Sequence, residues 1–253
     1  MNETVQRYTF AIAAHIALVL AWYLFVKLGN VPKFVMPSPE ATLNALLQPN
    51  YNWWSNVAVT GTEIFAGYFL ALVVGIALAL VFTWSKPLES FFMPLLVSLN
   101  MIPKVALGPL IIVWFKYGVF PNTLMAFSIC VFPILLTTAR GLREIEPELL
   151  DLVRSLKGSR WQLFTKVQLP GALPYIFSGM KVAAILAVAG AIVGEFLGSD
   201  KGLGYLMLQV QVTLDTPAMF MAVIMITLLG MALYGLLLLR ERCLVVKYAR
   251  IDA

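Results

Sequence analysis

Hydrophobic residues form long runs along the chain, and charged residues rarely interrupt them. Uncharged stretches cover residues 8–26, 64–85, 117–139 and 216–239. Each is close to the roughly 20 apolar residues that an α-helix needs to cross the hydrocarbon of a bilayer. These four stretches are predicted membrane spans.

Two further apolar regions contain charged residues. Residues 90–115 include Lys104, and residues 167–198 include Lys181 and Glu195. We interpret them as the third and fifth spans. The pattern therefore predicts an all-α, polytopic membrane protein with about six transmembrane helices.

The third region cannot be one straight helix, because Pro94, Pro103 and Pro109 interrupt it. Broken backbone at membrane depth is tolerated only where protein buries it or where it lines a cavity. The residues at the break are therefore candidates for a translocation path or gate: Asn100, Met101, Pro103 and Lys104. The alternative is a kinked packing helix whose Lys104 reaches the headgroups.

Acidic and basic residues within the spans are functional candidates by default. For Glu195 the sequence leaves two roles open, a path or gate residue and a structural pair with Lys201 or a partner subunit. Lys181 is expected to reach the inner headgroups. Glu63 faces either the path or the outer surface.

Lysine and arginine are distributed unequally between the two sides that six spans define. Twelve fall on the side of the termini and four on the other side. Cytoplasmic loops carry the basic excess, so both termini and the loop after residue 140 are predicted to be cytoplasmic. We expect a multi-pass membrane protein in this orientation.

Composition excludes several classes of function. The chain is 60% hydrophobic and 12% charged, so lipid is its main solvent, and the basic loops account for the net charge of +5 without a nucleic-acid partner. A phosphate-binding loop and a nucleophile elbow are both missing from the sequence. His15 has no cysteine or carboxylate at ligand spacing. We predict no catalytic residue, no metal site and no cofactor in this chain.

The loop that begins at Glu144 is the most hydrophilic part of the chain. Apolar residues at helical spacing predict a short amphipathic helix formed by Leu149, Leu150, Leu152, Val153 and Leu156. Gly158 and Ser159 can end it and cap the next helix. Such an element is either a structural connector at the membrane surface or a docking site for a soluble partner.

The segment DLVRSLKGSRWQLFTKVQLP, residues 151–170, resembles the EAA loop of permease subunits in bacterial ABC importers. That pattern reads Glu-Ala-Ala, three residues, Gly, nine residues, Ile, one residue, Leu-Pro. Its positions correspond here to Asp151, Leu152, Val153, Lys157, Val167, Leu169 and Pro170. Lys157 replaces the glycine, and Gly158 comes one place late.

Two flanking segments are similar to the nitrate, sulfonate and taurine branch of these permeases. IPKVALGPLIIVWFKYGV resembles the branch's Ile-Pro, Pro-Leu and Trp-Phe-Gly segment, with Lys116 replacing glycine. VGEFLGSDKGLGYLM resembles its glutamate followed by Gly-Leu-Gly. Together the resemblance covers about residues 50–240.

The resemblance implies a type I ABC importer permease fold with a cytoplasmic coupling helix. It divides the chain into an N-terminal helix and outer segment (1–50), a permease core (51–240) with the EAA-type loop at 144–171, and a cytoplasmic tail (241–253). The residues implied to couple to the ATPase are Asp151, Leu152, Val153, Leu156, Lys157, Gly158, Leu169 and Pro170.

The implied partners are an ATP-binding subunit that binds ATP and Mg, a periplasmic or lipid-anchored binding protein, a second copy of the chain, and lipid. The implied substrate is a small anion such as sulfonate, taurine or nitrate, with an aromatic acid or a pyrimidine or thiamine precursor as the alternative. Two other classes, an ATP-independent transporter or channel and a membrane scaffold, remain as rivals.

The Lys157-Gly158 pair carries one further expectation. A lysine at positive φ is strained, whereas glycine is not. We therefore predict that the turn shifts by one residue, so that Gly158 takes the left-handed position and Lys157 ends the preceding helix.

Overall fold

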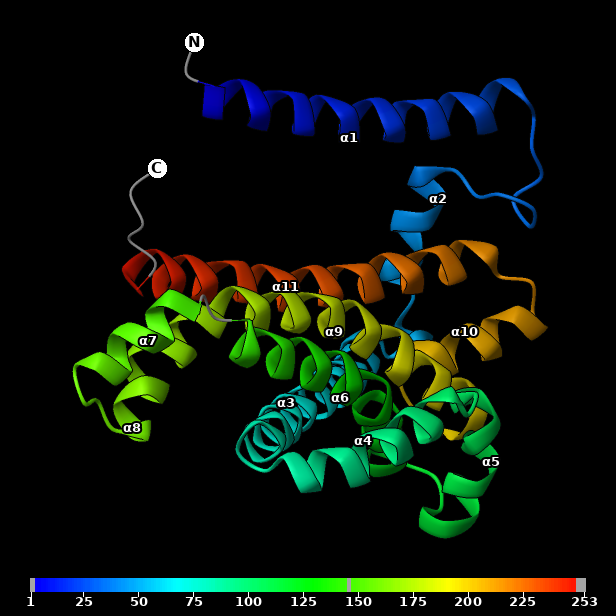
Figure 1. Ribbon diagram of the computed structural model, residues 1–253. Coiled ribbons are helices and arrows are strands. Elements are labelled where there is room, and N and C mark those ends of the chain that lie inside the picture. The colour runs from blue at the N-terminus through cyan, green and yellow to red at the C-terminus, as the bar shows by residue number, and fades with distance from the viewer. Residues whose placement is uncertain (1–2, 145–146, 249–253) are drawn as a thin grey trace.

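The computed structural model describes residues 3–144 and 147–248. Residues 145–146 of the predicted loop, residues 249–253 of the predicted tail and residues 1–2 lie outside this description. Within the described ranges every regular element is a helix (Figure 1). The predicted all-α class is confirmed.

The helices follow one another closely along the chain. In order they are α1 (Glu3–Leu28), α2 (Pro39–Asn44), η1 (Ala45–Leu47), η2 (Pro49–Tyr51), α3 (Trp53–Trp84), α4 (Lys86–Met101), α5 (Lys104–Phe115), α6 (Val119–Arg143), α7 (Pro147–Ser155), α8 (Arg160–Leu163), η3 (Phe164–Gln168), α9 (Leu169–Gly198), α10 (Leu203–Val212) and α11 (Thr216–Tyr248). The short η3 segment is π-helical, so α8, η3 and α9 form one continuous rod. Helix α11 extends past residue 240, where a tail was predicted to begin.

The centre of the molecule is α6, which packs along α9 on one side and α3 on the other. Small residues let these backbones approach closely. A Cβ on Gly190 of α9 would lie 2.7 Å from the Ala126 Cα of α6, and one on Gly67 of α3 would lie 2.8 Å from the Thr123 carbonyl oxygen. The core is thus built on backbone contact as much as on large side chains.

Four helical stretches are long and apolar enough to cross a bilayer: Pro49–Trp84, Val119–Arg143, Arg160–Gly198 and Thr216–Leu244. The third predicted span is instead a pair of helices, α4 and α5, bent by 94°. Of the first predicted span, the described apolar part, Ile12–Leu28, is shorter than a full crossing. By length and composition the described residues thus contain four candidate spans, or five with the bent pair, together with the shorter apolar helix Ile12–Leu28 of α1.

Helix α1 stands apart from the bundle, and most of its described side chains are exposed (Figure 1). It is attached near its C-terminal end, where the Trp22 indole N–H donates to the Pro37 carbonyl (3.0 Å) and the Trp22 ring lies against Phe220 of α11. An apolar helix with so little internal packing is covered by lipid or by another chain.

The two ends of the bundle differ in what they carry (Figure 1). Helices α7 and α8 lie at one end, together with the start of α1 and the end of α11. Helices α2, α5 and α10 lie towards the other end. The loop and the terminal helices therefore share one side of the molecule.

Candidate coupling loop and translocation site

The hydrophilic loop folds as two short helices joined by a tight turn, as predicted. Ser159 caps α8: its hydroxyl accepts from the Gln162 N–H (3.2 Å), and the Gln162 side chain accepts from the Ser159 N–H (2.8 Å). This reciprocal capping box satisfies two backbone donors that a helix start leaves unpaired. The turn thus passes directly into the rod formed by α8, η3 and α9.

The predicted register of this turn is wrong. Lys157 has φ of 54°, whereas Gly158 is not among the residues with positive φ. The Gly158 N–H donates to the Val153 carbonyl (2.8 Å), which is the six-to-one bond of a Schellman motif with Lys157 in the left-handed position. Lys157 therefore has a strained backbone conformation at the position where the family pattern has an unstrained glycine.

Gly158 is needed here for space rather than for φ. A Cβ at Gly158 would lie 2.6 Å from Val153 Cγ1 and 3.1 Å from the Val153 carbonyl oxygen. Shifting the turn by one residue would lose the Gly158–Val153 hydrogen bond and would bring a side chain into this narrow space, so the closed motif holds Lys157 at positive φ.

Helix α7 presents apolar side chains to its surroundings. Leu152 is 54% exposed and Leu156 is 73% exposed, while Val153 faces the turn and is half-buried. Asp151 and Lys157 are exposed beside them. The side chains of Leu150 and Arg154 lie outside the described part. Leu169 and Pro170 are half-buried at the start of α9, so they hold the rod rather than form the exposed face.

The candidate path residues Asn100, Met101 and Pro103 gather at the bend between α4 and α5. All three are exposed, Met101 at 77%. The Lys104 Nζ donates to the Leu99 carbonyl (3.0 Å), which the break leaves without its helical partner. The bend is therefore an irregular segment with exposed side chains between two apolar helices.

Glu195 is not at a surface, since only 1% of it is exposed, and Lys201 is not its partner. Its carboxylate accepts from the Thr60 hydroxyl (2.5 Å) and from the N–H groups of Gly204 and Tyr205. The hydrogen-bond partners of Glu195 within the chain are thus a hydroxyl and two backbone N–H groups.

The same cluster includes Glu63, which is fully buried rather than facing a path or the outer surface. Asn122 of α6 donates to Glu63 Oε1 (2.8 Å), and Thr60, one helical turn before Glu63 on α3, donates to Glu195, so the two carboxyl groups lie in one buried cluster. No sequence signal links two glutamates 132 positions apart; only the packing of α3 against α9 brings them together.

The Gly-Leu-Gly segment after α9 lies directly on this cluster. The Gly202 N–H donates to the Asn56 side chain (2.9 Å), and the Leu203 N–H donates to the Thr60 hydroxyl (2.8 Å). A Cβ on Gly202 would lie 2.3 Å from the Glu195 carboxyl carbon. The glycine is required because the glutamate occupies the space of a side chain.

Ion pairs connect the helices at the end of the bundle that carries α7 and α8. Lys181 of α9 pairs with Glu241 of α11 (2.7 Å), so it does not simply reach towards headgroups as expected. Arg143 of α6 pairs with Glu89 of α4 (2.5 Å). At the surface, hydrogen bonds from Arg140 and Tyr175 hold the pKa of Glu144 below its usual range.

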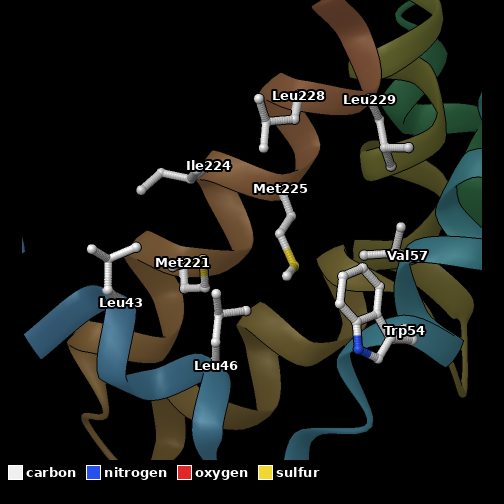
Figure 2. A pocket seen from close by; sticks show the side chains of 9 residues that line it. All are labelled: Leu43, Leu46, Trp54, Val57, Met221, Ile224, Met225, Leu228 and Leu229. Carbon is white, nitrogen blue, oxygen red and sulfur yellow. The ribbon is translucent and has the colours of Figure 1, made fainter. Parts of the chain in front are cut away.

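A groove of about 390 Å³ lies between α2, η1, α3 and α11 (Figure 2). Figure 2 shows Leu43 and Leu46 on one wall, Met221 and Met225 on another, and Trp54 at the edge. Its lining residues carry no charge that could orient an ion. Among residues 3–144 and 147–248, no cluster of three or more potential metal ligands was found.

The fold and its site define a helical membrane protein with a hydrophilic loop of two short helices at one end. Residues 67–242 match the family described as "Binding-protein-dependent transport system inner membrane component". The chain belongs to this family and is the permease subunit of an ABC transporter, a multi-pass inner-membrane protein that is not itself an ATPase.

Several curated relatives are similar over nearly their whole length. The riboflavin transport system permease protein RibX of Chloroflexus aurantiacus is 35% identical (90% of this chain, 86% of the relative). The formylaminopyrimidine transport permease protein ThiX of Halalkalibacterium halodurans is 30% identical (84% and 85%). The putative aliphatic sulfonates transport permease protein SsuC of Escherichia coli K12 is also 30% identical (85% and 82%).

A solved structure shares the fold. A chain of the MetNI methionine ABC transporter in an inward-facing conformation superposes with a TM-score of 0.57 at 20% identity, over 74% of this chain and 96% of that chain. The likeness supports the permease architecture described above.

Proposed function

We propose that this permease pairs with a second copy of itself to form an import path, and that α7 with its turn docks on a separate ATPase that binds ATP and Mg. The observation that carries the docking assignment is the exposed apolar face of α7. Leu152 and Leu156 face outward at the end of the α8–α9 rod. An amphipathic helix of this kind fits a hydrophobic groove on a soluble partner.

Co-purification with the ATPase subunit tests this assignment. Leu156→Glu is expected to abolish co-purification, because it places a charge in the apolar contact. Leu47→Glu is the matched control: Leu47 is 80% exposed but lies in η1, away from α7. Equal binding by both variants would remove α7 from the interface.

We assign the path to the bend between α4 and α5, through Asn100, Met101 and Pro103. Their exposure at a broken helix supports the assignment, because lipid does not tolerate irregular backbone that neither protein nor a cavity covers. Met101→Trp is expected to block uptake while ATPase co-purification persists. Unimpaired uptake by this variant contradicts the assignment.

The loop and both termini are assigned to the cytoplasmic side on the basis of the basic excess. The two cysteines offer a direct test, because Cys243 is exposed near the end of α11 whereas Cys130 is buried. A membrane-impermeant maleimide should label Cys243 in inside-out vesicles and not in right-side-out vesicles. Labelling only in right-side-out vesicles would reverse the orientation.

For the substrate we propose a small nitrogen heterocycle of the vitamin or vitamin-precursor kind. The similarity to the riboflavin and formylaminopyrimidine permeases supports it. An organic sulfonate is the second candidate, supported by the sulfonate permease. Uptake into proteoliposomes with the ATPase and the binding protein, measured for riboflavin, formylaminopyrimidine and alkyl sulfonates, separates the two.

A further inference from the structure

The hydrogen-bond pattern around Glu63 and Glu195 determines where a proton must lie. The Leu203 N–H donates to the Thr60 hydroxyl, so the single hydroxyl hydrogen of Thr60 is left for Glu195 Oε1. The N–H groups of Gly204 and Tyr205 donate to Glu195 Oε2. Both oxygens of Glu195 therefore face donors, which is the environment of a carboxylate.

Glu63 has the opposite pattern. Its Oε1 accepts from Asn122, while its Oε2 is buried and receives no donor. Thr60, one helical turn before Glu63 on α3, donates to the Glu195 carboxyl group, which places that group next to Glu63. An oxygen in that position is satisfied only if it carries a hydrogen and donates it. Two adjacent buried carboxylates would also repel each other strongly.

We propose that Glu63 and Glu195 hold one proton between them, with Glu63 as the acid and Glu195 as the carboxylate, and that this pair positions the α9–α10 turn. The pair connects four elements. Glu63 and Thr60 belong to α3, Asn122 to α6, Glu195 to α9, and the accepted N–H groups to α10.

The surroundings provide no alternative neutralising group. The side chains that contact the pair, Thr60 and Asn122, do not titrate, and α10 contributes backbone N–H groups. Among the ion pairs of the described residues, none joins a lysine or arginine to either carboxyl. Among the described residues no charged side chain thus neutralises the two carboxyl groups, and a shared proton would remove their repulsion.

A matched pair of amide substitutions tests the assignment on the full chain in lipid nanodiscs. Glu63→Gln keeps a donor towards Glu195 and an acceptor for Asn122, so the unfolding temperature should stay near that of the wild type. Glu195→Gln turns an NH₂ group towards existing donors and should lower it clearly. The same chemical change thus has opposite outcomes at two neighbouring positions.

Two measurements distinguish a shared proton from a merely structural contact. At neutral pH, infrared spectra of the wild type should contain the carbonyl stretch of a protonated carboxylic acid, and Glu63→Gln should lack it. Alkaline pH should lower the unfolding temperature of the wild type more than that of Glu63→Gln, because only the wild type has a shared proton to lose.

Each contrary result overturns the proposal. Two of these results concern stability: Glu63→Gln fails to fold, or Glu195→Gln keeps the unfolding temperature of the wild type. The other two are a wild-type spectrum without the carboxylic-acid band, and the same pH dependence of the unfolding temperature in the wild type and Glu63→Gln. The measurements need neither substrate nor ATPase, so they fail or succeed independently of the proposed transport function.

Discussion

The turns at Lys116 and Lys157 carry the same departure from the family pattern, a lysine in place of glycine, yet their backbones differ. Lys157 has φ of 54° in a Schellman motif, where the left-handed region costs a non-glycine residue about 1–2 kcal/mol. Lys116 ends α5 with φ of 64° and ψ of −166°, a region that is essentially restricted to glycine. The same replacement of glycine by lysine therefore causes more backbone strain at residue 116 than at residue 157.

The comparison also shows what keeps each lysine in place. At Lys157 the Gly158–Val153 contact fixes the turn. At Lys116 the backbone N–H donates to the Ile112 carbonyl (2.7 Å), and the chain must then reach α6 through Gly118, which has φ of 135°. In both turns the surrounding geometry decides the backbone conformation, and the side chain adapts to it.

The largest effect is expected for Gly158→Val. The added atoms would collide with Val153 and prevent the turn from closing, at a cost of about 3 kcal/mol, typical of severe overpacking. We expect loss of ATPase co-purification and of hydrogen-exchange protection at the residue 158 amide. Gly235→Val, at a helical site where a Cβ meets nothing within 4 Å, is the control.

Lys116→Gly should stabilise the permease by about 2 kcal/mol, because glycine adopts this backbone conformation without strain. The measurement is thermal or denaturant unfolding in nanodiscs. Lys116→Ala removes the same side chain but keeps the strain, so it should bring no gain. Equal stabilisation by both variants would attribute the effect to charge instead.

Lys157→Gly should stabilise the turn by about 1 kcal/mol, less than the change at Lys116, because the left-handed region of Lys157 costs a non-glycine residue less than the conformation of Lys116 does. Slower exchange of the Gly158 amide, which donates to Val153, is the direct readout. A larger gain at residue 157 than at residue 116 would invert the comparison.

The smallest effect is expected for Lys157→Ala, within about 0.5 kcal/mol of the wild type, because alanine meets the same positive φ and the lysine side chain is exposed. Coupling should therefore survive Lys157→Ala and fail in Gly158→Val. The sequence led to the same ordering for a different reason, the φ of Gly158 rather than the space around it.

The sequence predicted those features that depend on local pattern. Apolar runs located the long helices, and the Gly158-Ser159 pair located the turn and cap of the loop. It could not predict interactions between distant elements. The contact between Glu63 and Glu195 and the pair between Lys181 and Glu241 depend on how the helices pack.

The register at Lys157 was mispredicted for a related reason. Intrinsic φ preference favours glycine in the left-handed position, but the contact between Val153 and Gly158 outweighs that preference. The bend of 94° between α4 and α5 was foreseen as a break from its prolines, while its size follows only from the fold.

The close backbone approach in the core determines which parts of the permease can move. With α6 lying against α9 at Gly190 and against α3 at Gly67, the three helices meet at these points without intervening side chains, so there is little room for one to slide past another. We expect them to move together as one body. Changes of shape would then fall to the bend between α4 and α5 and to the weakly packed α1.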